Sequence, residues 1–521
     1  MSKILVISLV VLSFLLAFNS FAQDLADTLG GVLNKSSLDE ITKSKETLNK
    51  ATLLHLGVNS KRARIQLLAE AKEYVFVTVP YWYGDDEGKV IYKELKALKE
   101  RNPHIDIKIM VDWTSPASTG DFFASKMYLK LKKLIGRRNI VQWNKFWNFR
   151  GFSFKLSENR IHDKVFVVDG EKLVMGGMNI GNEYLQGGLT KVGWHDTDIL
   201  FEGPAAQVAT KVFLKPFLLQ KHLDRLGGNF PIDPMMQLKV LHYYFYYDIA
   251  RIPYLPASFL RKEKAVELPL GDFLGNSRYF PILSETPEQS TPVRLIYDNP
   301  FVDRKLVQKK IVHFSKTLDT LDFILPQAKH TMRVFIPYLT LSDRMIKTLQ
   351  TAATHLKVQI ITNSLKSHDL GRFNYYAALP SIQKLVNAGV EVYAWQGHTD
   401  LIEFEKKNDC KIDNYWPGRT LHTKAVILDR SVAILGSNNM NVRSEKHNSE
   451  IMALIRDPEI AKQLDDIFEY DLDKAETRSL SCGGKIFTNR PPRVLPITKE
   501  YLDKTVHGLK FKIFPKLYDF M

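Results

Sequence analysis

Cysteine is almost absent from this chain of 521 residues, which contains only Cys410 and Cys482. Two cysteines exclude a disulfide-dense scaffold and any metal cluster built on thiolates, because such structures need more of them. In an oxidising compartment the two residues could form one disulfide. The sequence leaves that pairing open, because it does not show whether the two Cα atoms come within reach.

Long apolar runs are also missing beyond the N-terminus, which excludes a protein with several membrane spans. The start, MSKILVISLVVLSFLLAFNSFAQD, places Lys3 before a short apolar stretch and the small-residue pattern SFA before Gln23. This order is typical of a secretory signal over residues 1–22, with an uncleaved membrane anchor as the alternative. We therefore expect an exported protein, periplasmic or secreted.

Acidic residues are in the minority, with 57 Asp and Glu against 72 Lys and Arg, and the net charge is +15. Loss of residues 1–22 would lower this charge by one, because that segment holds one Lys and no acidic residue. Such an excess predicts an anionic partner. A phospholipid surface and a nucleic acid fit equally well, and a merely solvated basic surface is the third possibility.

A long internal repeat organises the chain, whose length already exceeds what one hydrophobic core usually holds. The runs YVFVTVPYWYGDD from Tyr74 and MRVFIPYLTLSD from Met332 share a Pro-Tyr pair, and each precedes a helical stretch and an apolar strand. The halves then reach HDKVFVVDGEKLVMGGMN from His162 and HTKAVILDRSVAILGSNN from His422. The repeat predicts an α/β fold of two tandem homologous lobes, each a mixed β-sheet flanked by helices.

The repeat also sets the expected boundaries. A polar, helix-prone lead-in precedes the first lobe, a segment rich in Pro, Tyr and Phe joins the lobes, and a basic tail follows the second. The predicted division is a signal peptide (1–22), a helical lead-in (23–51), lobe 1 (52–222), a connecting segment (223–290), lobe 2 (291–480) and a C-terminal tail (481–521).

Both halves carry the same spaced motif, His-x-Lys-x4-Asp-x6-Gly-(Gly/Ser)-x-Asn. Residues two apart on a strand share one face, so each His and Lys point the same way. Imidazole can act as a nucleophile or proton shuttle, and the ammonium group can hold a phosphate oxygen. A single His-x-Lys is usually a surface or core histidine, but two copies in matched contexts indicate a catalytic site for phosphate chemistry.

These motifs resemble those of the phospholipase D superfamily, in its single-chain form with two motifs, over about residues 52–480. The strings RIHDKVFVVDG…GGMNIGNEYL and LHTKAVILDR…GSNNMNVRSEKHNSE are similar to the bacterial cardiolipin-synthase-like branch. The resemblance implies that both motifs face one pocket at the lobe interface. It also implies a covalent phosphohistidine intermediate and no metal or other cofactor.

By this resemblance, His162 is the nucleophile and His422 is the general acid and then the general base, with the reverse assignment open. The motif acids Asp169 and Asp429 complete the catalytic set, although the resemblance gives them a more structural part. The groups expected to bind the non-bridging phosphate oxygens are Lys164, Lys424, Asn179 and Asn439.

Each histidine also needs a carboxylate on its other ring nitrogen. The runs TDILFEGPAAQVA and SEIMALIRDPEIA align Asp198 with Glu450, where the family places an orienting acid, and Asp196 is the nearby alternative. The string GWHDTD resembles the Trp-x-Asp-Thr stretch of cardiolipin-synthase-like enzymes, with His195 where Arg is expected. That difference leaves the headgroup contact at this point open, and Trp194 could simply be packed in the core.

The sequence favours a lipid enzyme that hydrolyses phospholipids to phosphatidic acid or transfers phosphatidyl groups, as in cardiolipin synthesis. The export signal and the resemblance support it, as do the aromatic and basic run from Leu241 and the alternating tail from Leu509, which predict peripheral membrane contact. A metal-independent nuclease of the same superfamily is the alternative. Intact motifs argue against a decayed scaffold, and no obligate protein partner is implied.

Overall fold

The computed structural model describes most of the two predicted lobes. The described ranges are 35–112, 126–143, 160–187, 190–191, 193–227, 291–298, 315–369, 372–412, 418–473, 480–488 and 490–508. The predicted signal peptide, almost all of the connecting segment and the tail from Leu509 lie outside these ranges. Among the described residues, no helix is long and apolar enough to cross a membrane.

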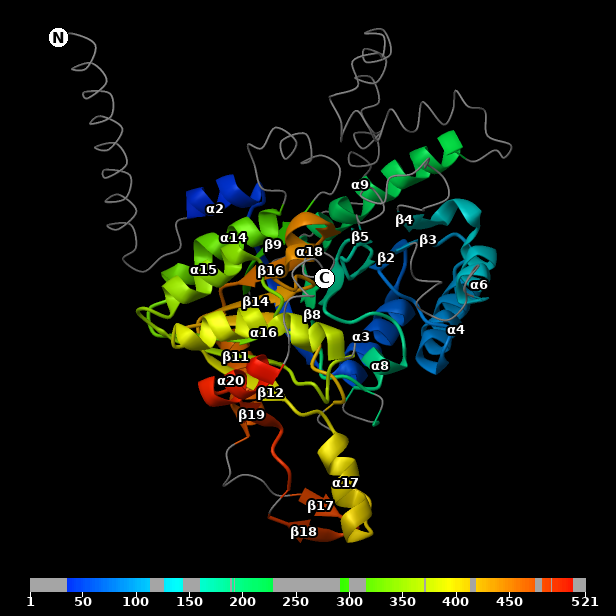
Figure 1. The fold of residues 1–521 in the computed structure, drawn as a ribbon. Coiled ribbons are helices and arrows are strands. Elements are labelled where there is room, and N and C mark those ends of the chain that lie inside the picture. Colours follow the sequence, from blue (N-terminus) through cyan, green and yellow to red (C-terminus); the bar gives the residue numbers. More distant parts are fainter. Residues whose placement is uncertain are drawn as a thin grey trace, which may run out of the picture.

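The first lobe alternates strands and helices along the chain (Figure 1). Before it comes α2 (Lys35–Thr42), which packs against lobe 2. The elements of lobe 1 are β1 (Thr47–His55), α3 (Gly57–Glu70), β2 (Tyr74–Val79), α4 (Asp86–Arg101), β3 (Asp106–Asp112), α6 (Lys126–Ile135), η1 (Arg137–Asn139), β4 (Ile140–Trp143), β5 (Arg160–Ile161), β6 (Val165–Val168), β7 (Lys172–Gly176), α8 (Asn182–Leu185), β8 (Thr197–Glu202) and α9 (Pro204–Gly227).

The second lobe repeats this order and adds a C-terminal extension. Its elements are β9 (Thr291–Tyr297), α14 (Lys316–Ile324), η4 (Leu325–Gln327), β10 (Thr331–Phe335), α15 (Asp343–Ala352), β11 (Lys357–Asn363), α16 (Arg372–Asn387), β12 (Glu391–Trp395), α17 (Thr399–Asn408), β13 (Ala425–Leu428), β14 (Val432–Gly436), α18 (Val442–Lys446), β15 (Asn448–Ser449), β16 (Ile451–Ile455), α19 (Pro458–Leu472), β17 (Leu480–Cys482), β18 (Lys485–Phe487), β19 (Val494–Pro496) and α20 (Lys499–Gly508).

In the described part of the chain, the two lobes share one continuous sheet of 15 strands, in the order β19-β12-β11-β10-β13-β14-β16-β9-β1-β8-β7-β6-β2-β3-β4. The outer strands β2-β3-β4 and β10-β11-β12 are parallel, and the inner strands pair antiparallel. The halves join where β1 pairs antiparallel with β9. The prediction of two homologous lobes with mixed sheets is therefore confirmed.

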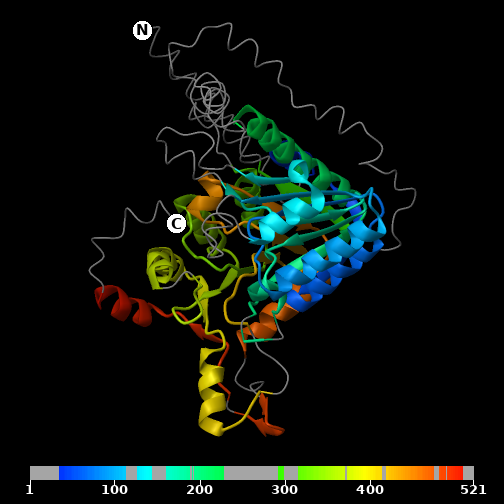
Figure 2. The same ribbon diagram turned by 90° about the vertical axis from the view of Figure 1, so that its right-hand side faces the viewer.

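Helices cover both faces of this sheet, so the strands are apolar on both sides. In β6 and β7, Val167 and Leu173 pack in one core while Phe166 and Val174 pack in another. The long helices α9 and α19 contribute to the first core, which continues across the β1–β9 junction. On the opposite face α3 and α4 cover lobe 1 (Figure 2), and α14, α15 and α16 cover lobe 2. The shared core fixes the two motifs relative to each other.

Two predicted boundaries are wrong. Residues 47–51, placed in the helical lead-in, begin β1 at the centre of the sheet, because β1 pairs with both β8 and β9. The sequence of β1 is rich in polar residues and the strand is partly exposed, so its pattern did not indicate a central strand. Its partner β9 also lies far along the chain. The predicted tail also begins within the fold, because β19 pairs with β12 and α20 packs against α16.

The pairing left open by the sequence is settled, because Cys410 and Cys482 form a disulfide with their Cα atoms 5.5 Å apart. The bond ties the segment after α17 to the hairpin β17–β18. These elements project from the body of lobe 2 (Figure 1). The contact between the rings of Phe404 and Phe487, 5.1 Å apart, adds packing between the same two elements.

Loss of this disulfide should lower stability. Replacing both Cys410 and Cys482 by Ser removes a constraint on a loop of 72 residues, which is worth about 4 kcal/mol in the chain-entropy picture. Urea unfolding followed by circular dichroism would measure it. The reduced wild-type protein should match the double variant, and equal unfolding midpoints for the oxidised protein and the variant would contradict the expectation.

Candidate active site

The two histidine motifs lie at the same point of their lobes, immediately before a buried strand. His162 precedes β6 and His422 precedes β13. The short strand β5 pairs with β15 of the other lobe, and His162 N donates to Ser449 O at 3.0 Å. In the matching place His422 N donates to His195 O at 2.7 Å. Each histidine is thus held by a segment of the opposite lobe.

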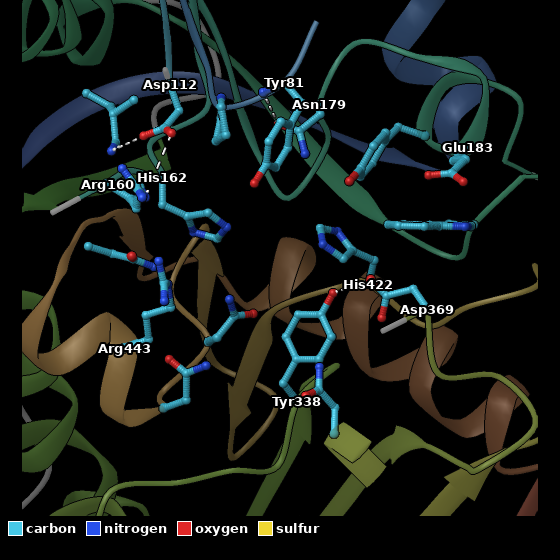
Figure 3. Close-up of a pocket in the computed structure, with 18 of the residues that line it drawn as sticks. Tyr81, Asp112, Arg160, His162, Asn179, Glu183, Tyr338, Asp369, His422 and Arg443 are labelled. Carbon is cyan, nitrogen blue, oxygen red and sulfur yellow. Dashed lines mark hydrogen bonds and ion pairs between the residues drawn. The ribbon is translucent and has the colours of Figure 1, made fainter. Parts of the chain in front are cut away.

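Both histidines line one cavity of about 770 Å³ at the lobe interface (Figure 3). Their rings face each other across it, with His162 near Arg443 and His422 near Asp369. Segments of both lobes contribute to its wall, including Asn179 of lobe 1. A cavity of this size can admit a phosphodiester and the groups on either side of it.

Glu450 orients His162. Its Oε2 lies 2.8 Å from Nδ1 of His162, and the carboxylate also accepts from Ser437 Oγ, Ser444 Oγ and Asn448 Nδ2 at 2.6, 2.7 and 2.9 Å. Burial raises the pKa of Glu450, but His162, Lys164 and Ser437 outweigh it and leave the pKa below its usual value. An ionised Glu450 holds a proton on Nδ1 of His162 and leaves Nε2 free to react.

Asp196 is the acid that orients His422, with its Oδ2 2.6 Å from Nδ1 of the ring. The prediction of Asp198 for this part is wrong. Asp198 lies inside lobe 1, where it accepts from Ser60 Oγ at 2.6 Å and pairs with Arg64 at 2.9 Å. Both aspartates are fully buried, and burial raises the pKa of each.

The register of the sheet explains the error. Gly176 is opposite Asp198 in the β7–β8 pair, whereas Gly436 is opposite Met452 in the β14–β16 pair. Glu450 therefore corresponds to Asp196, which lies two residues before Asp198, the residue that the sequence alignment had matched to Glu450. A sequence signal existed, because in both lobes the orienting acid directly precedes the first residue of the strand.

The Gly/Ser position of the motif differs between the lobes for a steric reason. A Cβ atom on Gly177 would lie 2.3 Å from Oδ1 of Asp196, so this position must be glycine. In lobe 2 the matching Ser437 instead donates to Glu450. The two orienting acids are therefore unequal. Glu450 is fixed by three hydrogen-bond donors besides His162, while Asp196 accepts from the Thr197 backbone N–H.

The motif lysines lie buried beside their histidines. Lys164 Nζ donates to His162 O at 2.8 Å, and Lys424 Nζ donates to His422 O. Burial lowers the pKa of Lys164 to about 8 and that of Lys424 to about 7, although Glu450 and Asp196 oppose this. Each ammonium is thus kept dry behind its histidine, and neither lysine is among the residues that line the cavity. In such a dry place a nearby bound anion would interact with it strongly.

Burial also lowers the pKa of both histidines. For His162 it falls to about 4, because burial and Lys164 outweigh the attraction of Glu450. For His422 burial, Lys424 and Lys164 bring the pKa well below its usual value. Both rings are therefore neutral at pH 7, which suits a nucleophile.

Asn179 and Asn439 line the cavity, as predicted for phosphate-binding groups. Asn179 Oδ1 accepts from Tyr81 N at 3.3 Å, which turns its amide group toward the site. Asn439 Oδ1 is buried and has no hydrogen-bond partner in the described part of the chain. Their role in holding phosphate stays a prediction.

The motif acids do not belong to the site, and their place in the predicted catalytic set is wrong. Asp169 lies at the far end of β6 from His162, where it accepts from the backbone of Lys72, Glu73 and Tyr74. Asp429 makes the matching bonds to the backbone N–H groups of Lys329, His330 and Thr331 at 2.7 to 2.8 Å. Both acids fix the start of the neighbouring strand, so their part is structural.

Sequence reasoning missed most of the cavity wall. Tyr184, Trp194 and Tyr338 surround His422, with ring centroids 5.3, 5.1 and 6.2 Å from it. Trp194 thus has a place at the site, while its neighbour His195 is fully buried behind it with Nε2 2.7 Å from Asp471. The Pro-Tyr pair of the repeat was a usable signal, because Tyr81 and Tyr338 both line the cavity.

No group of three or more His, Cys, Asp and Glu side chains in the described ranges is placed to hold a metal ion. The expectation of metal-independent chemistry stays a prediction.

Comparisons with known proteins agree with this geometry. A family model described as cardiolipin synthase, PLD-like domain matches residues 64–199 and 323–472. Cardiolipin synthase 1 of Staphylococcus aureus is 24% identical over 446 residues, which cover 84% of this chain and 69% of the relative. Cardiolipin synthase 2 of Bacillus cereus is 24% identical over 424 residues, covering 80% of this chain and 64% of the relative.

Among solved structures, phosphatidylserine synthase of Haemophilus influenzae Rd KW20 matches with a TM-score of 0.50 and 16% identity, over 84% of this chain and 89% of that one. At this identity the likeness shows the fold alone. The family match covers more than half of the chain and includes both histidine motifs. The chain therefore belongs to the phospholipase D superfamily and is a phospholipase D-like enzyme of the cardiolipin synthase branch.

Proposed function

We propose that this chain is an exported enzyme that cleaves glycerophospholipids and passes the phosphatidyl group to water or to an alcohol through a phosphohistidine. The observation that carries the proposal is the facing pair of His162 and His422, each backed by a carboxylate of the opposite lobe. With water as acceptor the product is phosphatidic acid. With a lipid alcohol as acceptor the product is of the cardiolipin type, and cardiolipin is the lipid in the names of the relatives.

In the first step Nε2 of His162 attacks phosphorus, so that a P–N bond forms and the P–O bond to the headgroup breaks. The departing oxygen takes a proton from Nε2 of His422. The negative phosphate raises the pKa of His422 by offsetting the charges of Lys164 and Lys424, so His422 gains its proton as the substrate binds. The two lysines stabilise the charge on the non-bridging oxygens.

In the second step His422 acts as the base. It removes the proton of the incoming water or alcohol, whose oxygen attacks phosphorus while the P–N bond to His162 breaks. Glu450 supports the positive charge that His162 carries in the intermediate, because its carboxylate stays ionised on Nδ1. Asp196 does the same for His422 when that ring is protonated.

This scheme predicts a bell-shaped pH profile for kcat/KM. Activity should rise as His162 loses its proton near its pKa of about 4. It should begin to fall as the pH passes the lowered pKa of His422, because that ring must then take up a proton as the substrate binds. It should fall further as Lys424 and Lys164 lose their protons near about 7 and about 8, because neutral lysines no longer hold the phosphate. Initial rates on a soluble phosphodiester between pH 3 and 10 would measure both limbs. A rate that stays constant from pH 6 to 10 would contradict the part given to the lysines.

Product analysis tests the proposed function. The protein is incubated in chelator with vesicles of phosphatidylglycerol and phosphatidylethanolamine, or with plasmid DNA, each with and without added alcohol. We expect phosphatidic acid, and with alcohol the matching phosphatidyl alcohol, in the lipid samples. Activity that needs an added divalent ion would contradict the metal-free scheme.

A nuclease of the same superfamily is the second candidate, favoured by the net charge of +15. The same two-histidine chemistry can break any phosphodiester. Cut plasmid in the DNA samples, with the lipids intact, would establish this candidate in place of the first.

The export signal and peripheral membrane contact are also part of the proposal. They rest on the apolar start and the basic tail, which lie outside the described residues.

A further inference from the structure

The two ends of the cavity carry opposite charge. Arg160 and Arg443 lie at the end near His162, whereas Glu183 and Asp369 lie at the end near His422 (Figure 3). Asp112 partly balances the basic end, with its Oδ1 3.9 Å from Arg160 Nε. A substrate that spans the cavity therefore meets a different field on each side of its phosphorus.

The acidic end contains a buried carboxylate with one weakly held oxygen. Asp369 Oδ2 accepts from Tyr338 OH at 2.7 Å. Its Oδ1 is buried without a hydrogen-bond partner among the described residues, and Nδ1 of His368 lies 3.5 Å away. Within the described ranges this oxygen is supported only by the long ion pair with His368, so it can accept a hydrogen bond from a ligand.

The carboxylates at this end act on the groups around them. Burial raises the pKa of Glu183, and the charge of Asp369 raises it further against the opposing effect of Arg419. The pKa of Tyr83 is raised by burial and by Glu183, Asp85 and Asp369 among its neighbours. The charge of Asp369 therefore reaches Glu183 and Tyr83, while for Asp369 itself burial raises the pKa and His368 and Tyr338 outweigh it and leave the pKa below its usual value.

Aromatic rings complete this end. Tyr184 and Trp194 lie 4.7 Å apart in an edge contact, and Tyr83 lies 6.4 Å from Tyr184. With Tyr338 they surround the space beside His422. Aromatic faces beside carboxylates form a site for an organic cation, since both attract a positive charge and the rings cover its methylene groups.

We infer that the alcohol that leaves or enters beside His422 is an amino alcohol, so that the preferred headgroup is of the ethanolamine class. This inference rests on the proposed function. In-line displacement puts that alcohol opposite His162, on the side of His422, where Glu183 and Asp369 lie. The ammonium group would bind Asp369 Oδ1 and Glu183, and the basic end would repel it.

A competition between two acceptors tests the inference with one donor lipid. Phosphatidylglycerol vesicles are incubated with the enzyme and an equimolar mixture of ethanolamine and 1-propanol, which have nearly the same shape and differ in charge. Phosphatidylethanolamine should exceed phosphatidylpropanol about tenfold, as expected for one ammonium–carboxylate and cation–π contact. Glu183→Gln and Asp369→Asn should each lower this ratio several-fold. The matched control, Glu403→Gln on the exposed face of α17, should leave the ratio unchanged.

Because the readout is a ratio of two products from one reaction, a partly unfolded variant still reports it. Equal amounts of the two products from the wild type, or an unchanged ratio in both acidic-end variants, would overturn the inference and leave the proposed function standing. Absence of any phosphatidyl alcohol and of any headgroup release would overturn the proposed function and the inference together.

Discussion

Replacing His162 by Ala should lower turnover at least about 10⁴-fold, because the nucleophile that splits the reaction into two steps is lost. Replacing His422 by Ala should lower lipid turnover by about 10²–10⁴-fold, the usual contribution of a general acid and base. The matched control is His104→Ala, because His104 is exposed on the surface of lobe 1. Rates with phospholipid vesicles measure the effect, and either active-site variant at the wild-type rate would contradict the shared-pocket scheme.

The same two variants separate the roles of the histidines. A p-nitrophenyl phosphodiester has a leaving group that needs no proton, so His422→Ala should still release one p-nitrophenol per active site and then stall as phosphoenzyme. His162→Ala should show no such burst. A burst from His162→Ala alone would reverse the assignment, which the sequence had left open.

The second large effect concerns the orienting acids. Asp196→Asn should lower kcat by about 10²–10⁴-fold with little change in stability, because His422 loses the carboxylate that fixes its tautomer and supports its charge. Asp198→Asn should instead lower the free energy of unfolding by about 3–5 kcal/mol, since it leaves the buried Arg64 without its partner.

Steady-state rates and urea unfolding of both variants measure the two effects. The pair acts as its own control, because both residues are fully buried, two positions apart, and change by the same single atom. The opposite result would be an Asp198→Asn variant that loses activity at unchanged stability, beside a fully active Asp196→Asn variant. It would show that Asp198, as the sequence alignment predicted, is the acid that orients His422.

The sequence by itself determined the duplicated lobes, the two motifs and the phosphate chemistry. These features are encoded locally. His162 and Lys164 are two residues apart, so they lie on the same face of their strand whatever sheet the strand joins. The copy at His422 and Lys424 repeats that spacing, which is why the motif was secure without a structure. The separate α/β lobes followed from the alternation of apolar strands with helical stretches.

Only the tertiary structure decided which groups act together. His162 and Glu450 are 288 residues apart and belong to different lobes, and they meet because β5 pairs with β15. A slip of two residues in the alignment keeps a side chain on the same face of a strand, so periodicity could not separate Asp196 from Asp198. The acidic end of the cavity likewise joins Glu183 of α8 in lobe 1 with Asp369 of the loop between β11 and α16 in lobe 2, which no local pattern records.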